Sequence, residues 1–172
     1  VTIYPYNEYI SDQVRKNRGY EQKYINLICS FIRPGDTVLD IGANMGLHTL
    51  HYSRAVGKKG KVLAFEPDPA NLEILKRNVI LNKCKNVTIY PIALNDKGGV
   101  RKLYLCERNK GKQGFADLDN LNHPINVGVL KASNIPETRK ARVIKIDVEG
   151  SEPQVFSGFD NYKPPIIFFE FT

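Results

Sequence analysis

Three acidic side chains stand where two apolar segments in the last third of the chain end. Asp147 and Glu149 come at or just after the segment 143–147, and Glu170 ends the segment 166–170. In open sheets of parallel strands, ligands bind in the crevice beyond the carboxyl ends of the strands. Three carboxylates at that edge can serve as a proton acceptor, as a hydrogen-bond clamp or as ligands of a divalent metal.

A lysine lies two residues before the first of these acids. Alternate side chains of a strand share a face, so Lys145 and Asp147 point to the same side. A lysine in the middle of a covered parallel strand is costly unless it is paired, and the pattern therefore predicts an ion pair between them. The alternative is that Asp147 serves only as this partner and as the cap of the helix that follows.

A glycine-rich turn joins the apolar segment 37–41 to the expected start of a helix. Gly42 and Gly46 permit the tight turn and the close backbone approach that such a loop makes to a ligand. Glu66 ends a second apolar run twenty residues after Gly46, a spacing suited to hydrogen bonds with ribose hydroxyls. The pattern predicts a loop that binds a nucleoside cofactor, and the alternative is a turn used only for tight packing.

Strand-like and helix-like segments alternate, which predicts an α/β fold with a mostly parallel sheet and helices on both faces. The expected strands are 37–41, 61–65, 87–90, 143–147 and 166–170, the last apolar enough to be fully buried. One helix is expected before Arg33, a second from Met45 or Gly46, and a third after the cap residue Asp68. The expected buried faces are Tyr20, Tyr24, Leu27, Ile28 and Phe31 in the first helix, and Leu72, Leu75 and Val79 in the third. Residues 98–107 are expected to form a hairpin-like excursion, followed by a polar stretch over 109–126.

The chain has 172 residues and a formal net charge of +7. Its basic clusters lack the interleaved aromatic residues that stack bases, which favours solvated loops over a nucleic-acid surface. No apolar run approaches the roughly 18 residues of a membrane span and no signal peptide opens the chain, so a cytoplasmic location is expected. The three cysteines are widely spaced, and reduced thiols are expected.

Two histidines in the second expected helix invite a metal-binding interpretation. His48 and His51 are three residues apart and could share a metal with His123 or with an acid. A histidine at this place more often lines the core or a cofactor pocket. No metal site is therefore predicted.

Four motifs, in this order, resemble the FkbM family of S-adenosylmethionine-dependent methyltransferases. They are residues 38–46, 65–69 with Asn71, 93–96 with Gly98, and 144–152. The resemblance covers residues of about 20 to 170 and implies the Rossmann-like class I methyltransferase fold. It also implies methyl transfer from S-adenosylmethionine to oxygen, commonly a sugar or polyketide hydroxyl.

The resemblance assigns the residues that hold the cofactor. By it, the loop from Asp40 to Gly46 holds the methionine part, Glu66 holds the ribose, and Ala93 with Leu94 holds the adenine. The complete set expected to bind the cofactor is Tyr20, Glu21, Asp40, Gly42, Ala43, Asn44, Gly46, His48, Glu66, Pro67, Ala93, Leu94 and Asp147. Position 48 is often aromatic in similar proteins and is histidine here, which changes one wall of the expected pocket.

The expected acceptor is a hydroxyl on a sugar, glycan or other small metabolite. A hydroxyl is a poor nucleophile, so a carboxylate within reach would take its proton. We expect Asp147 to be this base, with Glu149 as the reserve and Glu170 orienting the acceptor. Lys145 would tune the nearby acids or hold the carboxylate of the cofactor.

The chain is expected to form a single domain over 1–172, with a flanking or lid helix in 1–33 and a Rossmann-like core in 34–172. Chains of this fold normally continue past the fifth strand into two more strands. We therefore expect the C-terminal strands to be missing, as in a minimal version of the fold or a piece of a longer protein.

Three other functions remain open on the sequence. An NAD-dependent oxidoreductase is disfavoured, because Gly-x-Gly-x-x-Gly is absent and Asn44 stands where a pyrophosphate needs bare backbone. A nucleic-acid methyltransferase would keep the cofactor loop and change the acceptor. A non-catalytic cofactor-binding module would keep only the loop and Glu66.

Overall fold

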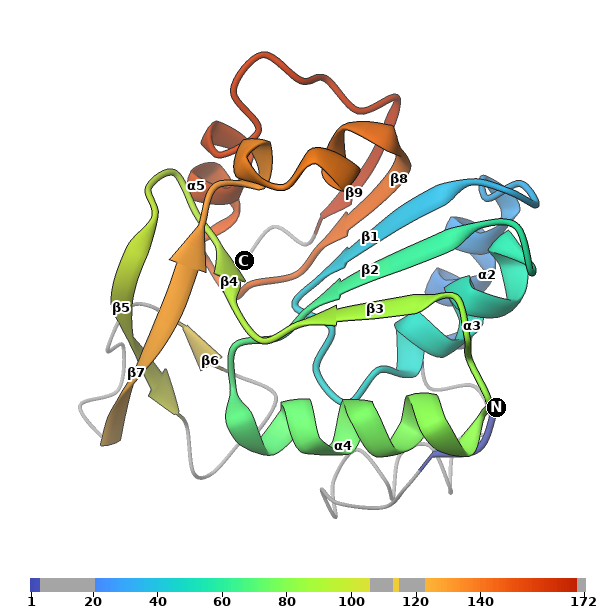
Figure 1. Ribbon diagram of the computed structural model, residues 1–172, viewed down its shortest axis with the longest axis horizontal. Coiled ribbons are helices and arrows are strands. Elements are labelled where there is room, and N and C mark those ends of the chain that lie inside the picture. The colour runs from blue at the N-terminus through green and yellow to red at the C-terminus, as the bar shows by residue number, and fades with distance from the viewer. Residues whose placement is uncertain (4–20, 106–112, 115–122, 170–172) are drawn as a thin grey trace.

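The main sheet of the protein has five parallel strands in the order β3-β2-β1-β8-β9. The computed structural model describes residues 1–3, 21–105, 113–114 and 123–169 (Figure 1). The strands are β1 (Thr37–Ile41), β2 (Lys61–Phe65), β3 (Val87–Tyr90), β8 (Ala141–Ile146) and β9 (Ile166–Phe169). The predicted α/β fold with a mostly parallel sheet is confirmed.

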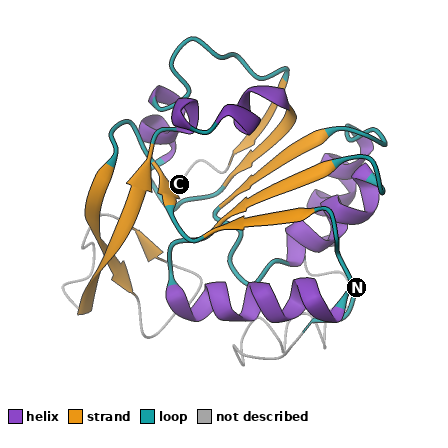
Figure 2. Ribbon diagram, in the orientation of Figure 1, coloured by secondary structure: helices purple, strands orange, loops and turns teal. Residues whose placement is uncertain are grey.

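Helices cover both faces of this sheet (Figure 2). Successive residues of a strand point to opposite faces, and both faces carry buried apolar side chains. On one face, Val38 and Val143 pack against α2 (Gln22–Ser30) and α3 (Leu47–Val56). Ala64 on the same face packs against α4 (Pro69–Leu81). The buried faces of the strands therefore fix which helices lie on each side.

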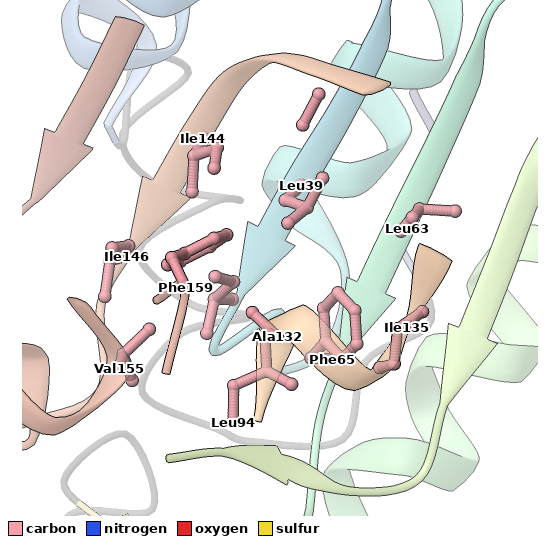
Figure 3. Packing of buried hydrophobic residues seen from close by; sticks show 12 residues of the cluster. Leu39, Leu63, Phe65, Leu94, Ala132, Ile135, Ile144, Ile146, Val155 and Phe159 are labelled. Atoms are coloured by element: carbon pink, nitrogen blue, oxygen red, sulfur yellow. The ribbon is translucent and has the colours of Figure 1, made fainter. Parts of the chain in front are cut away.

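The opposite face of the sheet carries the largest apolar cluster. Leu39 and Ile144 pack there with Val155 of α5 (Glu152–Ser157) and with Ala132 of the short 3₁₀ helix η1 (Ala132–Asn134) (Figure 3). A second 3₁₀ helix, η2 (Pro136–Lys140), leads into β8. This cluster packs against β1, β2 and β8 on that face of the sheet.

A second sheet, in the order β4-β7-β5-β6, stands beside the first (Figure 1). Its strands are β4 (Ala93–Leu94), β5 (Gly99–Leu105), β6 (Gln113–Gly114) and β7 (His123–Leu130). β5 and β7 are antiparallel, with Gly99 opposite Val129. The extended segment expected over 98–107 is confirmed as β5 over its described part, but its antiparallel partner is β7, which occupies part of a region expected to be only a polar stretch.

The helix α4 begins where its sequence signals predict. Asp68 caps it, its side chain accepting a hydrogen bond from the backbone N–H of Ala70 at 2.9 Å, and Pro69 is the first helical residue. The expected buried stripe is only partly right, since Leu75 is buried but Leu72 and Val79 are half-buried.

Two expectations about burial are wrong. Among the described residues of the first helix, only Ile28 is buried as predicted, while Tyr24, Leu27 and Phe31 are exposed and Ile25 is buried in their place, so α2 turns a different face to α3. Strand β9 is not fully buried: it is the last strand in the order of the main sheet within the described residues, and its side chains are half-buried or exposed.

Candidate active site

A pocket lies beyond the carboxyl ends of β1, β2 and β8. The chain runs from β1 to β2 and β3 on one side, and β8 then pairs with the other side of β1. This reversal of strand order leaves a crevice between the ends of β1 and β8, which is where open α/β sheets bind ligands. The pocket is therefore placed by the topology of the sheet.

The glycine loop after β1 forms one wall, and its backbone donors are all in use. Gly42 and Gly46 have φ values of +77° and +90°, and Asn44 also adopts a left-handed conformation. The N–H groups of Gly42 and Ala43 donate to the carbonyl of Phe65 at the end of β2. The remaining three N–H groups of the loop donate to Glu66, to the Asn44 side chain and to the carbonyl of Ala43.

Glu66 lines the pocket beside this loop. Its Oε2 accepts a hydrogen bond from the backbone N–H of Asn44 at 2.7 Å, and its Oε1 accepts one from that of Asp68 at 2.9 Å. Burial of the side chain raises the pKa of Glu66 to about 7, although these two hydrogen bonds act in the opposite direction. Each carboxylate oxygen has a second lone pair for a ligand hydroxyl.

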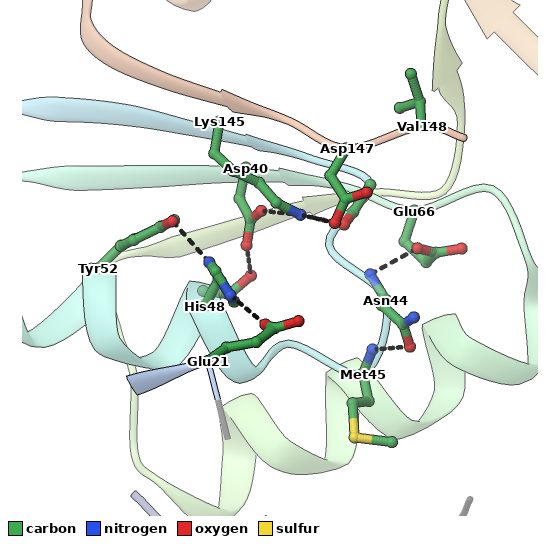
Figure 4. A network of polar contacts seen from close by, with 12 residues as sticks. Glu21, Asp40, Asn44, Met45, His48, Tyr52, Glu66, Lys145, Asp147 and Val148 are labelled. Carbon is green, nitrogen blue, oxygen red and sulfur yellow. Dashed lines mark hydrogen bonds and ion pairs between the residues drawn. The ribbon is translucent and has the colours of Figure 1, made fainter. Parts of the chain in front are cut away.

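A buried ion cluster joins β1, the glycine loop and β8 (Figure 4). The ammonium of Lys145 lies 3.1 Å from Oδ2 of Asp147, 3.5 Å from Oδ1 of Asp40 and 2.9 Å from the carbonyl oxygen of Gly42. Burial alone would lower the pKa of Lys145, but the two carboxylates outweigh it and raise the pKa above its usual value. The predicted pair of Lys145 with Asp147 is confirmed, and Asp40 is a partner that the sequence did not reveal.

A second polar chain lies behind the glycine loop. Nε2 of His48 is 2.6 Å from Oε2 of Glu21, and Nδ1 is 2.8 Å from the hydroxyl of Tyr52 (Figure 4). The hydrogen bond with His48 is the largest cause that lowers the pKa of Glu21. Burial raises the pKa of Tyr52, which therefore keeps its proton. These two hydrogen bonds of His48 connect Glu21, at the start of α2, to Tyr52 in α3.

The structure brings most of the predicted site residues to the pocket and places others around it. The predicted residues that line it are Gly42, Asn44, Glu66, Pro67, Ala93, Leu94, Asp147 and Glu149. Asp40 and Ala43 are buried, Gly46 caps α3, and Glu21 and His48 form the polar chain behind the loop. Tyr20 and Glu170 lie outside the described residues.

Five residues that line the pocket were not predicted to do so. They are Ile41, Phe65, Asn71, Leu103 and Val148. The first two end their strands beside predicted site residues, and Asn71 belongs to a motif already singled out, so their positions were within reach of the sequence. Leu103 comes from the second sheet, which no local signal places over the pocket.

The described ionisable side chains that line the pocket are all acidic. Its lining contains three carboxyl side chains, those of Glu66, Asp147 and Glu149, and none of the described lining residues is lysine, arginine or histidine. Asp147 does not cap α5, because the cap residue of that helix is Ser151. The site therefore presents carboxyl groups, the amides of Asn44 and Asn71, and apolar surface to whatever binds there.

The described part of the chain has neither a metal-like cluster of side chains nor a helix suited to a membrane. No group of three or more His, Cys, Asp or Glu side chains with the arrangement of a metal site occurs among those residues. None of the described helices combines the length and apolarity needed to cross a bilayer.

Known methyltransferases are similar to this chain in sequence. The 31-O-demethyl-FK506 methyltransferase FkbM of Streptomyces tacrolimicus is 25% identical over 194 residues, covering 94% of this chain and 70% of that protein. The hexuronic acid methyltransferase AglP of Haloferax volcanii is 27% identical over 161 residues, covering 87% of this chain and 60% of that protein. The chain thus spans 60% to 70% of the length of these relatives.

A solved structure and a family model complete the comparison. The structure of methyltransferase FkbM from Methylobacillus flagellatus KT superposes with a TM-score of 0.52 at 17% identity, covering 78% of this chain and 35% of that one. This likeness supports the fold. The methyltransferase FkbM domain model matches residues 40–172. Because that match extends over most of the chain, the protein belongs to the FkbM methyltransferase family.

Proposed function

We propose that the protein is an S-adenosylmethionine-dependent methyltransferase that methylates a hydroxyl on a sugar, glycan or other small metabolite. Membership of the FkbM family supports methyl transfer. The names of two relatives, which act on 31-O-demethyl-FK506 and on hexuronic acid, support a hydroxylated small molecule as the acceptor.

The observation that carries the choice of cofactor is the use of every backbone N–H from Gly42 to Gly46 within the protein. Dinucleotide sites need free N–H groups at this turn, because the pyrophosphate is held by backbone donors. The pocket lining is acidic as well, which repels phosphates and attracts a sulfonium or ammonium cation. S-adenosylmethionine fits these two conditions and NAD does not.

The residues around the pocket would divide the cofactor among them. Glu66, with a free lone pair on each oxygen, would accept hydrogen bonds from the ribose hydroxyls. Ala93 and Leu94 offer apolar surface for the adenine, and the loop from Gly42 to Asn44 would meet the methionine part. S-adenosylmethionine supplies an activated methyl group when it is bound.

The protein would contribute orientation and a base. Holding an acceptor oxygen in line with the methyl group can supply about 7 to 11 kcal/mol of the barrier. Asp147 lines the pocket just beyond β8 and would take the proton of the acceptor hydroxyl. Glu149 lines the same edge and is the reserve for this role.

Ligand binding followed by methyl transfer tests the proposal. S-adenosylmethionine at about 100 times its dissociation constant should stabilise the fold by roughly 2.7 kcal/mol, a melting shift of about 5 to 10 °C for a chain of this size. NAD should give no shift in the same scan. Radiolabelled methyl transfer to a panel of hexuronic acids, neutral glycans and macrolides should then identify the acceptor class.

Two outcomes would contradict the proposal. A larger melting shift with NAD would overturn the choice of cofactor. Transfer to RNA or DNA, with binding that weakens steeply as salt is added, would show a nucleic-acid acceptor, because phosphate contacts are lost with salt.

A further inference from the structure

We infer that Lys145 is a positioning residue that holds the carboxylate of Asp147 in place at the cofactor loop. The inference rests on the proposed function and deepens it, since it concerns how the base is held. It follows from the contacts of one buried ammonium group with three segments of the chain.

The ammonium of Lys145 has three donors, and three protein oxygens surround it. They belong to Asp40 inside β1, to the carbonyl of Gly42 in the glycine loop and to Asp147 after β8, at 3.5, 2.9 and 3.1 Å. Its side chain is only 5% exposed. The Gly42 carbonyl accepts a hydrogen bond from the ammonium and the two carboxylates hold it by ion pairs. A buried group engaged by the protein in this way argues against the alternative that Lys145 holds the carboxylate of the cofactor.

The same contact divides the two oxygens of Asp147 between different tasks. Oδ2 is held by Lys145, and Figure 4 shows the other oxygen directed away from the ammonium, towards the side where Glu66 lies. The side chain of Asp147 is 37% exposed and lines the pocket, so a ligand in the pocket can reach this carboxylate. Lys145 therefore fixes one oxygen of Asp147, and the other oxygen points away from the ammonium.

The contacts of Lys145 also hold Asp147 at a fixed distance from the glycine loop, which would meet the methionine part of the cofactor. Lys145 binds the carbonyl of Gly42, and the backbone N–H of Asp147 donates to the carbonyl of Ile41 at 3.1 Å. Two bonds thus join the end of β8 to the residues that open the glycine loop. A displacement of a catalytic group by about 1 Å can cost on the order of 100-fold in rate, so this connection matters for turnover.

A mutant cycle tests whether Lys145 acts through Asp147. The variants are Lys145→Met, Asp147→Asn and the two together, with kcat and the dissociation constant of S-adenosylmethionine measured for each. Lys145→Met should lower kcat by about 10- to 100-fold while the cofactor dissociation constant changes by less than about threefold. In the Asp147→Asn background, Lys145→Met should change kcat by less than about twofold, because there is no base left to position.

Lys145→Met leaves the fully buried Asp40 without its cation, which can prevent folding. The cycle is therefore repeated in an Asp40→Asn background, where that buried charge is gone, and kcat values are compared within the background. Arg142→Met is the matched control: it removes another paired cation from β8, the partner of Asp36 at 3.2 Å. This variant should keep kcat within about twofold of the wild type.

The outcomes separate this inference from the proposed function. If the wild type transfers methyl groups but the losses from Lys145→Met and Asp147→Asn multiply, Lys145 does not act through Asp147 and the inference is overturned. Equal losses in kcat and in cofactor affinity would also overturn it, since they indicate a general structural role. If the wild type binds S-adenosylmethionine and transfers no methyl group, the proposed function fails and the inference fails with it.

Discussion

The backbone of Gly42 lies directly against the backbone carbonyl of Asp147. A Cβ atom on Gly42 would stand 1.8 Å from that carbonyl oxygen, and the φ of Gly42 is +77°. The approach is possible only for glycine, because no other residue leaves this space empty. The end of β1 and the end of β8 can therefore meet at the bottom of the pocket.

Gly42→Ala should destabilise the protein by more than the backbone conformation alone explains. The left-handed conformation costs an alanine about 1 to 2 kcal/mol, and the clash with Asp147 adds about 1 to 3 kcal/mol as the strand ends move apart. Gly35→Ala is the control, since Gly35 has a φ of +94° and nothing within 4 Å of the added Cβ. Urea unfolding should show the larger loss for Gly42→Ala, and equal losses would contradict the close approach.

Local signals predicted the parts of the fold that depend on few residues. The bounds of β3 and the start of α4 at Pro69 match expectation, because an apolar run and a capped, proline-led helix are read within a short window. Strand β7 was missed although Ile125, Val127 and Val129 alternate with Asn126 and Gly128, because the pattern is short and its partner β5 lies well before it in the chain. The face of α2 was wrong because contacts with α3, not helical periodicity alone, decide which residues are buried.

In the candidate site too, contacts within one strand were predictable and contacts between distant segments were not. The pair of Lys145 with Asp147 follows from alternation along one strand. Asp40 joins it only because β1 and β8 pair with Asp40 beside Lys145, a register that no local pattern contains. The contact of Glu21 with His48 likewise spans 27 residues and needs α2 to lie on α3.

Cofactor affinity should depend on the protonation of Glu66. The folded protein without ligand has a raised pKa of about 7 for this carboxyl group, caused mainly by burial, whereas ribose hydroxyls bind best to the carboxylate. Affinity should therefore fall as the pH drops below 7, by up to about tenfold per pH unit, and binding near pH 6.5 should release a proton. Calorimetry in buffers of different ionisation enthalpy measures this release.

The stability of the ligand-free protein should change with pH in the opposite sense. A carboxyl group whose pKa rises on folding makes the folded state bind more protons than the unfolded state between pH 4.5 and 7. The contribution of Glu66 is thus fully present below pH 4.5 and is lost as the pH rises through 7. Glu66→Gln should flatten both pH dependences and weaken the cofactor by about 1.5 to 3 kcal/mol. Unchanged pH profiles in Glu66→Gln would remove Glu66 from the ribose site.

Asp147→Asn should abolish or severely reduce methyl transfer while the cofactor still binds. Loss of a general base typically costs about 10² to 10⁴ in rate, and asparagine keeps the shape of the side chain and an oxygen for Lys145. Glu149→Gln, on the same edge of the pocket, is the comparison, and it should cost less because Asp147 is the proposed base and its carboxylate is held by Lys145. Turnover, cofactor affinity and melting temperature are measured on both variants with an acceptor that the wild type methylates. Normal turnover by Asp147→Asn with a large loss in Glu149→Gln would transfer the role of base to Glu149, since both carboxylates face the same pocket and only the rates distinguish them.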